Sequence, residues 1–266
     1  MLLTVEELGI TLRDSGRTLL EGVSFELSKG DRLGLIGESG SGKSITALAL
    51  LGLLPGSMRA RGRITLDGIQ VVGAPETALE GMRGRAAAMI FQEPLSALDP
   101  LMRVGRQIAG PVKLHQRLTG DAARREVFSL LHRVRLPDPE RIASSLPHEL
   151  SGGQRQRIAM AMALACKPAL LIADEPTTAL DVTVQAEVLS LLDELVTEEG
   201  MALLFITHDL PVISRVARRL LVMQDGRIVE SDTTANILSS PKHPSTVRLL
   251  EAARRVTTLP YTRGDR

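Results

Sequence analysis

One loop limits what this chain can fold into more than any other feature: a glycine-rich segment that ends in lysine and serine. The segment consists of Gly37, Glu38, Ser39, Gly40, Ser41, Gly42, Lys43 and Ser44, a G-x-x-x-x-G-K-S pattern. The apolar run 33–36 before it predicts a buried strand, and residues 43–54 after it predict a helix that stops at Pro55-Gly56. A strand, such a loop and a helix in this order predict a phosphate-binding loop.

The chemistry of phosphate binding explains the composition of the loop. Glycines let successive backbone N–H groups point at one anion, and the N-terminus of the following helix adds a partial positive charge. We expect Lys43 to reach the β- and γ-phosphates of a bound nucleotide and the Ser44 hydroxyl to ligate Mg²⁺. The loop therefore predicts a site for a nucleoside triphosphate and a magnesium ion.

Composition narrows the range of binding partners. The chain has 266 residues, enough for one large domain or for one domain with subdomains. Its 32 basic and 31 acidic residues nearly balance, so no global field favours nucleic acid or an anionic membrane. With four Phe, one Tyr and no Trp, the chain also has few aromatic residues for a base-stacking surface. We therefore expect no nucleic-acid partner.

No stretch of the sequence predicts export or a membrane span. The apolar runs 158–166, 169–173 and 201–206 are far shorter than a bilayer requires, and the first residues lack the basic and apolar regions of a signal peptide. Cys166 is the only cysteine, which excludes an intrachain disulfide, and we interpret it as a small buried helix residue. The sequence predicts a soluble cytoplasmic protein, with any membrane spans supplied by another polypeptide.

Two kinds of strand pattern occur along the chain. Apolar and polar residues alternate through the first thirty residues, which predicts half-buried antiparallel strands. Asp67-Gly68 and Asp225-Gly226 each lie between two apolar runs and predict β-hairpins. The continuous apolar runs 169–173 and 202–206 are instead typical of parallel strands covered on both faces. Apolar residues at helical spacing between these two runs predict a crossover helix, closed by Gly200.

A helical stretch separates the two sets of strands. Residues from about 97 to 165 carry polar faces rich in Arg and Glu and are interrupted at Leu136-Pro137-Asp138-Pro139. The chain as a whole therefore predicts an α/β fold, with antiparallel strands near its N-terminus and parallel strands after the helical stretch.

Two acids close one of the predicted parallel strands. Asp174 and Glu175 follow the apolar run 170–173, and ligands of α/β sheets bind at the carboxyl ends of parallel strands. Asp174 would hold Mg²⁺ beside Ser44, directly or through water. Glu175 is placed to orient and polarise a water molecule in line with the γ-phosphate. A solvated acidic pair without function is disfavoured, because the phosphate loop needs a metal partner on a neighbouring strand.

Two polar residues at other strand ends are weaker signals. His208 follows the run that ends at Thr207, and beside the loop and the acids it is a candidate for contacting the γ-phosphate. Gln92 follows Met89-Ile90-Phe91 at an apparent strand end and by itself indicates little.

The order and spacing of these motifs resemble those of ABC-type ATPases. Between Gln92 and the acids lies Leu150-Ser151-Gly152-Gly153-Gln154, which is similar to the signature sequence of that family, and Ala179-Leu180-Asp181 follows the acids. The resemblance covers nearly the whole chain. It implies a P-loop NTPase of ABC type, in which a RecA-like core and an antiparallel β-subdomain accompany a helical subdomain at about 97–160. The implied division is an ATPase domain at 1–235 and a short C-terminal extension at 236–266.

The resemblance also implies roles for individual residues, with ATP and Mg²⁺ as cofactors. In such ATPases two domains close head to tail, and the signature of one caps the ATP held by the phosphate loop of the other. The capping residues here would be Ser151, Gly152, Gly153 and Gln154, which offer a hydroxyl, backbone N–H groups and a helix N-terminus. Asp181 would lie at the dimer seam and His208 would respond to the γ-phosphate. Gln92 would assist catalysis, contribute to the Mg²⁺ site and couple nucleotide state to a transporter.

A narrower likeness points to one branch of importers. Three segments resemble the ATP-binding subunits of oligopeptide, dipeptide and nickel importers, namely 91–100, 147–157 and 173–182. Lys242-His243-Pro244-Ser245-Thr246 resembles the C-terminal H-P-Y-T segment of that branch, with Ser245 in place of Tyr. Leu12 stands where these ATPases commonly place an aromatic residue under adenine, so aliphatic packing or a neighbour such as Arg13 must take its place.

These likenesses imply an ATP-hydrolysing subunit of an import complex for peptides, nickel or other metal chelates. The implied partners are a second ATPase subunit (a heterodimer is favoured and a homodimer possible), two transmembrane permease subunits and an extracytoplasmic substrate-binding protein. The permeases would hold the chain at the cytoplasmic face of the cell membrane. The alternative is a non-transport ABC ATPase of DNA repair or translation. It is disfavoured because an ordinary helical stretch, and no coiled coil or zinc module, separates Gln92 from Ser151, and because there is one cassette.

Overall fold

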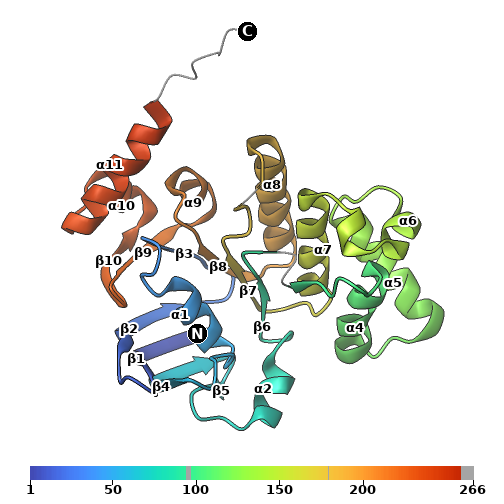
Figure 1. Ribbon diagram of the computed structural model, residues 1–266, viewed down its shortest axis with the longest axis horizontal. Helices are drawn as coiled ribbons and strands as arrows, with labels where there is room; N and C mark the ends of the chain where they lie inside the picture. The colour runs from blue at the N-terminus through green and yellow to red at the C-terminus, as the bar shows by residue number, and fades with distance from the viewer. Residues whose placement is uncertain (94–96, 179, 259–266) are drawn as a thin grey trace.

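Two β-sheets organise the structure, a computed structural model that describes residues 1–93, 97–178 and 180–258 (Figure 1). The four-stranded antiparallel sheet has the order β2-β1-β4-β5, with β1 (Leu3–Leu12), β2 (Thr18–Leu27), β4 (Met58–Leu66) and β5 (Ile69–Gln70). The six-stranded sheet has the order β10-β9-β3-β8-β7-β6, with β3 (Arg32–Gly37), β6 (Ala87–Ile90), β7 (Leu170–Asp174), β8 (Ala202–Ile206), β9 (Arg219–Gln224) and β10 (Arg227–Thr233). Its strands pair in parallel, except that β9 and β10 are antiparallel.

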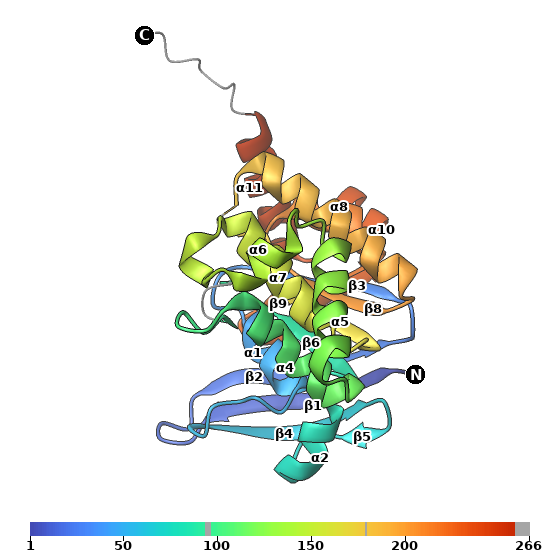
Figure 2. The ribbon, with the colours of Figure 1, turned by 90° about the vertical axis from the view of Figure 1, so that its right-hand side faces the viewer.

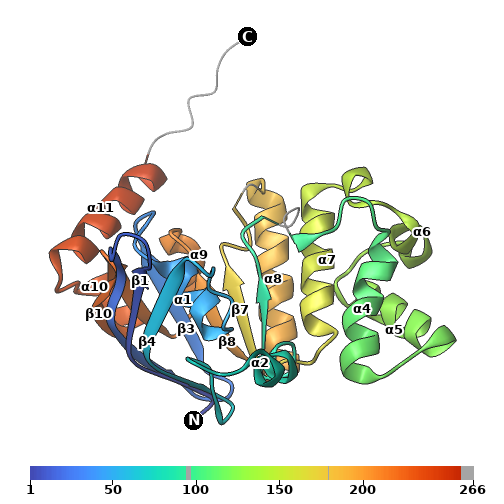
Figure 3. The ribbon, with the colours of Figure 1, turned by 60° about the horizontal axis from the view of Figure 1, so that its bottom comes forward.

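The helices lie on both sides of the parallel sheet and beyond one end of it. They are α1 (Lys43–Leu50), α2 (Glu76–Met82), α4 (Val104–Gln116), α5 (Gly120–Arg133), α6 (Pro139–Ser144), the 3-10 turn η1 (Pro147–Glu149), α7 (Gly152–Leu164), α8 (Val182–Glu198), α9 (Leu210–Val216), α10 (Thr234–Ser239) and α11 (Pro244–Thr258). Figure 3 shows α8 beside α7, with α4, α5 and α6 farther from the sheets. None of the helices in the described ranges is long and apolar enough to span a bilayer.

Two hydrophobic clusters pack against opposite faces of the parallel sheet. Along β7, Leu170 and Ile172 pack into a cluster with α1 and the antiparallel sheet, whereas Leu171 and Ala173 pack into a cluster with α7 and α8. Figure 2 shows the antiparallel sheet and α8 on opposite sides of β3 and β8. Because successive strand residues point to opposite faces, a strand buried on both sides needs a continuous apolar run. The parallel strands predicted at 169–173 and 202–206 are therefore confirmed.

Both predicted hairpins are present. Leu66 pairs with Ile69 across Asp67-Gly68, and Gln224 pairs with Arg227 across Asp225-Gly226. All four turn residues have positive φ, between 46° and 82°. A two-residue turn of this kind requires positive φ at both positions, which Asp-Gly tolerates better than most pairs.

The helix after the phosphate-binding loop is shorter than predicted. α1 ends at Leu50 rather than near residue 54, because Gly52 adopts a φ of 63° and closes the helix. The N–H of Leu53 donates to the carbonyl of Leu48 (2.9 Å) and that of Gly52 to Ala49 (3.1 Å), the two bonds of a Schellman cap. The Pro55-Gly56 pair therefore lies beyond the true end of the helix.

Cys166 also differs from its predicted setting. It is half-buried and lies past the C-terminal end of α7 instead of inside the helix. Burial raises the pKa of its thiol to about 11, so the sulfur stays protonated at neutral pH.

The carboxylate of Glu230 connects the C-terminal segment to the β9–β10 hairpin by hydrogen bonds. Glu230 on β10 accepts hydrogen bonds from the backbone N–H groups of Lys242 (2.9 Å) and His243 (3.0 Å), just before α11 begins. The Ser245 hydroxyl contacts Gln224 on β9, and Thr246 is fully buried. The residues that resemble the H-P-Y-T segment thus start a docked helix. The part of the predicted extension at 259–266 lies outside the described residues.

We expect Glu230→Ala to lower the free energy of unfolding by about 1 kcal/mol, the usual net contribution of a hydrogen bond in a folded protein. Burial acts to raise the pKa of the Glu230 carboxyl, but the hydrogen bonds from the backbone N–H groups of His243 and Lys242 hold it below its ordinary value of 4.5. The stabilisation should therefore be complete above pH 4.5 and be lost as pH falls through the lowered pKa.

Urea unfolding of both proteins at pH 7 and in acid measures this difference. Glu251→Ala, which removes an exposed carboxylate from α11, is the matched control. An unfolding free-energy difference between wild type and Glu230→Ala that stays the same in strong acid would contradict the assignment.

Candidate functional site

Four neighbouring strands deliver the predicted site residues to one edge of the parallel sheet. β3, β8, β7 and β6 are adjacent and parallel, so their carboxyl ends meet at the same edge. The phosphate-binding loop follows β3 and His208 follows β8. Asp174 ends β7, with Glu175 next in the chain, and Gln92 follows β6. This is the edge at which ligands bind in open α/β sheets.

The loop after β3 depends on glycines at two close approaches. A side chain at Gly37 would place its Cβ 2.2 Å from the carbonyl oxygen of Met223, and one at Gly42 would lie 2.4 Å from Leu20. Gly42 also has a φ of 106° and immediately precedes α1. Glu38, Ser39 and Gly40 are exposed at the tip of the loop, and Ser41 is buried. The loop therefore leads into a helix N-terminus, as the sequence predicted.

Lys43 is folded into its own loop. Its Nζ donates hydrogen bonds to the carbonyl oxygens of Gly37 (2.8 Å) and Glu38 (2.9 Å), and the residue is only 6% exposed. Burial lowers the pKa of the Lys43 amine, while the Glu175 and Asp174 carboxylates act to raise it. The nearby carboxylates thus favour the charged amine, and an incoming anion would meet this cation at the base of the loop.

Asp174 presents a buried oxygen without a partner. The residue is 4% exposed, and its Oδ1 has no hydrogen-bond partner among residues 1–93, 97–178 and 180–258. Burial raises the pKa of its carboxyl, and a hydrogen bond with Ser44 acts in the opposite direction, to lower this pKa. Asp174, Ser44 and Gln92 line one cavity of about 300 Å³. A buried, unpaired carboxylate oxygen beside a hydroxyl and an amide oxygen is a donor set that fits Mg²⁺.

Glu175 is held by three side chains. Its Oε1 lies 3.0 Å from His208 Nδ1, and its Oε2 accepts from Thr178 Oγ1 (2.9 Å) and Gln92 Nε2 (3.3 Å). Burial acts to raise the pKa of the Glu175 carboxyl, but the hydrogen bonds from His208 and Thr178 hold it below its ordinary value. The carboxylate is thus ionised at neutral pH and points into the same cluster as Gln92 and His208.

The signature-like segment caps a different helix. Ser151 is the N-cap of α7: its Oγ accepts from the Gln154 N–H (3.3 Å), and the Gln154 side chain accepts from the Ser151 N–H (3.0 Å). Gly153 packs against α8 so closely that an added Cβ would lie 2.6 Å from Val184. Ser151 and Gly152 remain exposed. The structure therefore gathers Ser44, Gln92, Asp174, Glu175 and His208 but leaves the signature outside that cluster.

Asp181 was predicted at a dimer seam, and Leu12 and Arg13 near the adenine base. Asp181 is the N-cap of α8 and accepts from the Val184 N–H (3.0 Å), while Ala179 lies outside the described residues. Leu12 is half-buried at the end of β1. Arg13 does not extend freely, because its Nε donates to the carbonyl of Met58 (3.1 Å).

Thr178 belongs to the site although no sequence pattern had indicated it. Its contact with Glu175 follows from a turn, because the Thr178 N–H donates to the Glu175 carbonyl (3.2 Å) and brings the two side chains together. Pro176 after Glu175 is the turn signal that could have indicated this contact.

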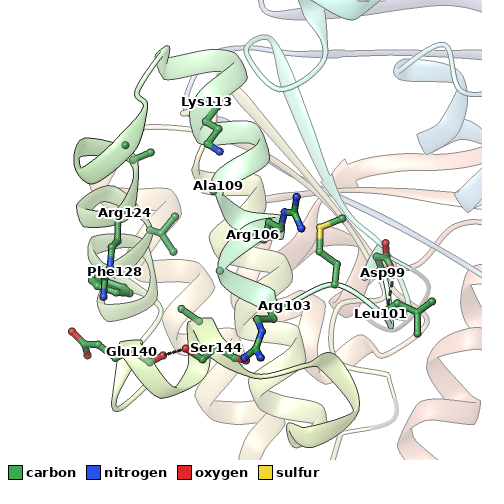
Figure 4. Close-up of a pocket in the computed structure, with 16 residues that line it drawn as sticks. Asp99, Leu101, Arg103, Arg106, Ala109, Lys113, Arg124, Phe128, Glu140 and Ser144 are labelled. Carbon is green, nitrogen blue, oxygen red and sulfur yellow. Dashed lines mark hydrogen bonds between the residues drawn. The ribbon is translucent and has the colours of Figure 1, made fainter.

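A second hollow lies among the helices, away from the loop. It measures about 710 Å³ and is enclosed by α4, α5, α6 and the segment before α4. Figure 4 shows Arg106 and Lys113 on α4, Arg103 just before this helix, and Arg124 stacked on Phe128. Leu101 at its border is 89% exposed. No sequence pattern had predicted this basic, partly apolar surface.

The family model for ABC transporters matches residues 20–178, more than half of the chain. The chain belongs to this family. The match contains the phosphate-binding loop, the signature and both acids, so the fold expected from the resemblance, an ABC-type P-loop ATPase, is confirmed.

Relatives agree with this membership. The chain is 44% identical over 254 residues to the oligopeptide transport ATP-binding protein OppD of Bacillus subtilis (strain 168), an alignment that covers 94% of this chain and 71% of the relative. It is 48% identical over 255 residues to the peptidoglycan transport ATP-binding protein YejF of Agrobacterium fabrum, covering 94% of this chain. The chain spans only about half of that relative, 47%.

A solved structure shares the fold. The dimeric ATP-binding cassette MJ0796, in a post-hydrolysis state bound to ADP and phosphate, superposes with a TM-score of 0.78 at 26% identity. The match covers 88% of this chain and 99% of that cassette.

Replacing Lys43 with alanine should weaken nucleotide binding. We expect the affinity for ATP to fall about 10- to 100-fold, because hydrogen bonds to charged groups contribute about 1.5–3 kcal/mol. Titration with a fluorescent ATP analogue measures the affinity, with the exposed Lys29→Ala as control. Equal affinities of wild type and Lys43→Ala would remove Lys43 from the binding site.

Proposed function

We propose that this chain binds and hydrolyses MgATP as one subunit of an import complex for peptides. One observation supports the ATPase part: a buried lysine, an ionised glutamate and a buried carboxylate oxygen with no partner among the described residues gather at the mouth of a phosphate-binding loop. The names of the relatives support the proposal that the chain belongs to an import complex. They are described as transport ATP-binding proteins for oligopeptides and peptidoglycan and as an import protein for glutathione.

Each residue of the cluster has a proposed task. Lys43 and the N–H groups of the loop would bind the β- and γ-phosphates. Ser44, Asp174 and Gln92 would hold Mg²⁺, which when bound neutralises charge on the phosphate oxygens. His208 would donate to the γ-phosphate.

Glu175 would act as the general base. It would orient a water molecule and accept its proton as the water oxygen bonds to the γ-phosphorus. The bond from that phosphorus to the bridging oxygen breaks at the same time, and its electron pair leaves with ADP. A lowered pKa of the Glu175 carboxyl supports this role, since only the ionised form accepts a proton.

A complete site would need a second ATPase subunit. The exposed N-terminus of α7 with Ser151 and Gly152 supports a role in capping ATP on another chain, because its hydrogen bonds leave these groups facing outward. The dimeric state of the MJ0796 cassette supports the same arrangement. We favour a heterodimer within the complex, although this chain's own motifs would also permit a homodimer.

Separate permease subunits would bind at the hollow among α4, α5 and α6. This surface begins at Asp99, shortly after Gln92, so a change at the nucleotide would reach it through a short stretch of chain. Exposed Leu101 and the cations of α4 suit a partner helix with apolar and acidic side chains (Figure 4). Through these permeases the chain would lie at the cytoplasmic face of the cell membrane, and an extracytoplasmic binding protein would deliver the cargo.

Peptides are favoured over nickel or other metal chelates as cargo. The relatives named above carry or import peptides and peptide-like molecules. The same names argue against a non-transport ATPase of DNA repair or translation.

Glu175→Gln should retain ATP binding and lose turnover. We expect single-turnover hydrolysis to fall about 100-fold or more, because the amide cannot accept the proton of the attacking water. Rapid-quench assays with saturating MgATP measure the rate, and peptide uptake by cells that carry only this variant should stop. The exposed Glu198→Gln on α8 is the matched control. A near-normal hydrolysis rate would exclude Glu175 as the base.

Ser151→Arg tests whether the signature acts on another chain. Within the complex assembled with its partner ATPase, the bulky cation should disable the site whose phosphate loop belongs to the partner. Binding at this chain's own loop should persist, as photo-crosslinking of labelled ATP to each subunit would reveal. Ser151→Thr keeps the hydroxyl and serves as control. Loss of binding at the chain's own loop would contradict the arrangement between subunits.

A further inference from the structure

We propose that Thr178 is a positioning residue for hydrolysis: its hydroxyl fixes Oε2 of Glu175, so that Oε1 stays free for the attacking water. The inference rests on the proposed ATP hydrolysis and adds a residue to it. Thr178 donates to Oε2 at 2.9 Å, the shortest of the three hydrogen bonds that hold this carboxylate.

The other two donors have competing tasks. Gln92 and His208 come from the ends of β6 and β8, and both are exposed, His208 by 60% of its side chain. When they turn to Mg²⁺ and to the γ-phosphate, Glu175 loses both of these hydrogen bonds. Thr178 is then the one donor of the three that remains.

The backbone keeps Thr178 in place. Glu175, Pro176, Thr177 and Thr178 form a turn closed by the bond from the Thr178 N–H to the Glu175 carbonyl (3.2 Å). Pro176 restricts φ at the second position of this turn. The Glu175 N–H donates to Ile206 of β8 (2.9 Å), which anchors the turn to the sheet. The separation of the two side chains is therefore set by a local, tethered turn and does not depend on nucleotide.

The two carboxylate oxygens of Glu175 have different contacts and therefore different proposed roles. His208 contacts Oε1, whereas Thr178 contacts Oε2. Once His208 leaves, Oε1 becomes free to accept a hydrogen bond and then the proton from water. Without Thr178 the carboxylate could rotate about its terminal torsion, which is soft, and would spend less time aimed at the water.

Thr178→Val, which keeps the shape and removes the hydroxyl, is the test, with Thr178→Ala as a second removal if valine is not accommodated. For the full chain with MgATP we expect kcat to fall roughly 10- to 100-fold, with the dissociation constant for ATP unchanged. Thr178→Ser should restore most of the rate. Thr177→Val is the matched control, since the Thr177 hydroxyl accepts from Gln185 and does not contact Glu175.

A crystal structure with a non-hydrolysable ATP analogue supplies a readout independent of activity. We expect Thr178 Oγ1 to stay within hydrogen-bond distance of Glu175 Oε2 while Gln92 and His208 turn to the ligand. Equal rates of Thr178→Val and wild type, an equal loss in Thr177→Val, or no recovery with Thr178→Ser would each overturn the inference alone. Absence of hydrolysis by the wild-type chain, alone and with partner subunits, would overturn the proposed function and the inference with it.

Discussion

The burial of β7 on both faces is the constraint on which the site depends. Because its four residues from Leu170 to Ala173 pack alternately into the two hydrophobic clusters, the strand cannot shift by one residue without burying Asp174 in the core. That fixed register delivers Asp174 to the edge of the sheet, where the residue is buried and one of its oxygens has no partner among the described residues. The same packing sets Glu175 one step farther along, where the chain turns. The buried strand β7 is thus followed by two carboxylates in different environments. Burial raises the pKa of the Asp174 carboxyl, whereas hydrogen bonds lower the pKa of the Glu175 carboxyl.

Several polar side chains of the site hydrogen-bond within the site itself. Lys43 donates to two carbonyls of its own loop, and Gln92 and His208 contact Glu175. A bound triphosphate would replace these bonds with bonds of its own, so binding would exchange partners and would leave few buried groups unpaired. This exchange of hydrogen bonds would also link the phosphate-binding loop to Glu175. When Gln92 and His208 turn to the nucleotide, Glu175 would lose two of its three hydrogen bonds. Thr178 differs from Gln92 and His208 because it has no proposed contact with the nucleotide or Mg²⁺. We therefore assign Thr178 to positioning Glu175, and Gln92 and His208 to responding to the nucleotide.

Most of the fold and most of the site residues could be predicted because they depend on local patterns. The apolar runs gave β7 and β8, Asp67-Gly68 and Asp225-Gly226 gave hairpins, and the loop gave the start of α1 at Lys43. The end of α1 was wrong because Gly52 closes the helix in a left-handed conformation, which competes with the proline signal that follows. Thr178 and the hollow near Leu101 were missed for other reasons. The Thr178 contact depends on the geometry of one four-residue turn, which side-chain periodicity does not mark. The hollow forms only when α4, α5 and α6 meet, and no pattern within one segment indicates it.

Ser151 and Asp181 cap the N-termini of α7 and α8, two helices that pack together within this chain. Gly153 packs on Val184 in the first turn of α8, whose N-cap is Asp181, and Arg157 of α7 pairs with Glu187 of α8 at 2.8 Å. The ion pair is partly exposed and contributes little by itself. The close packing at Gly153 is more restrictive, because any side chain there would push the two helices apart. A subunit that closes on its partner would therefore present Ser151 and Asp181 together, and the geometry at one ATP would be set by the α7–α8 contact of the opposite chain.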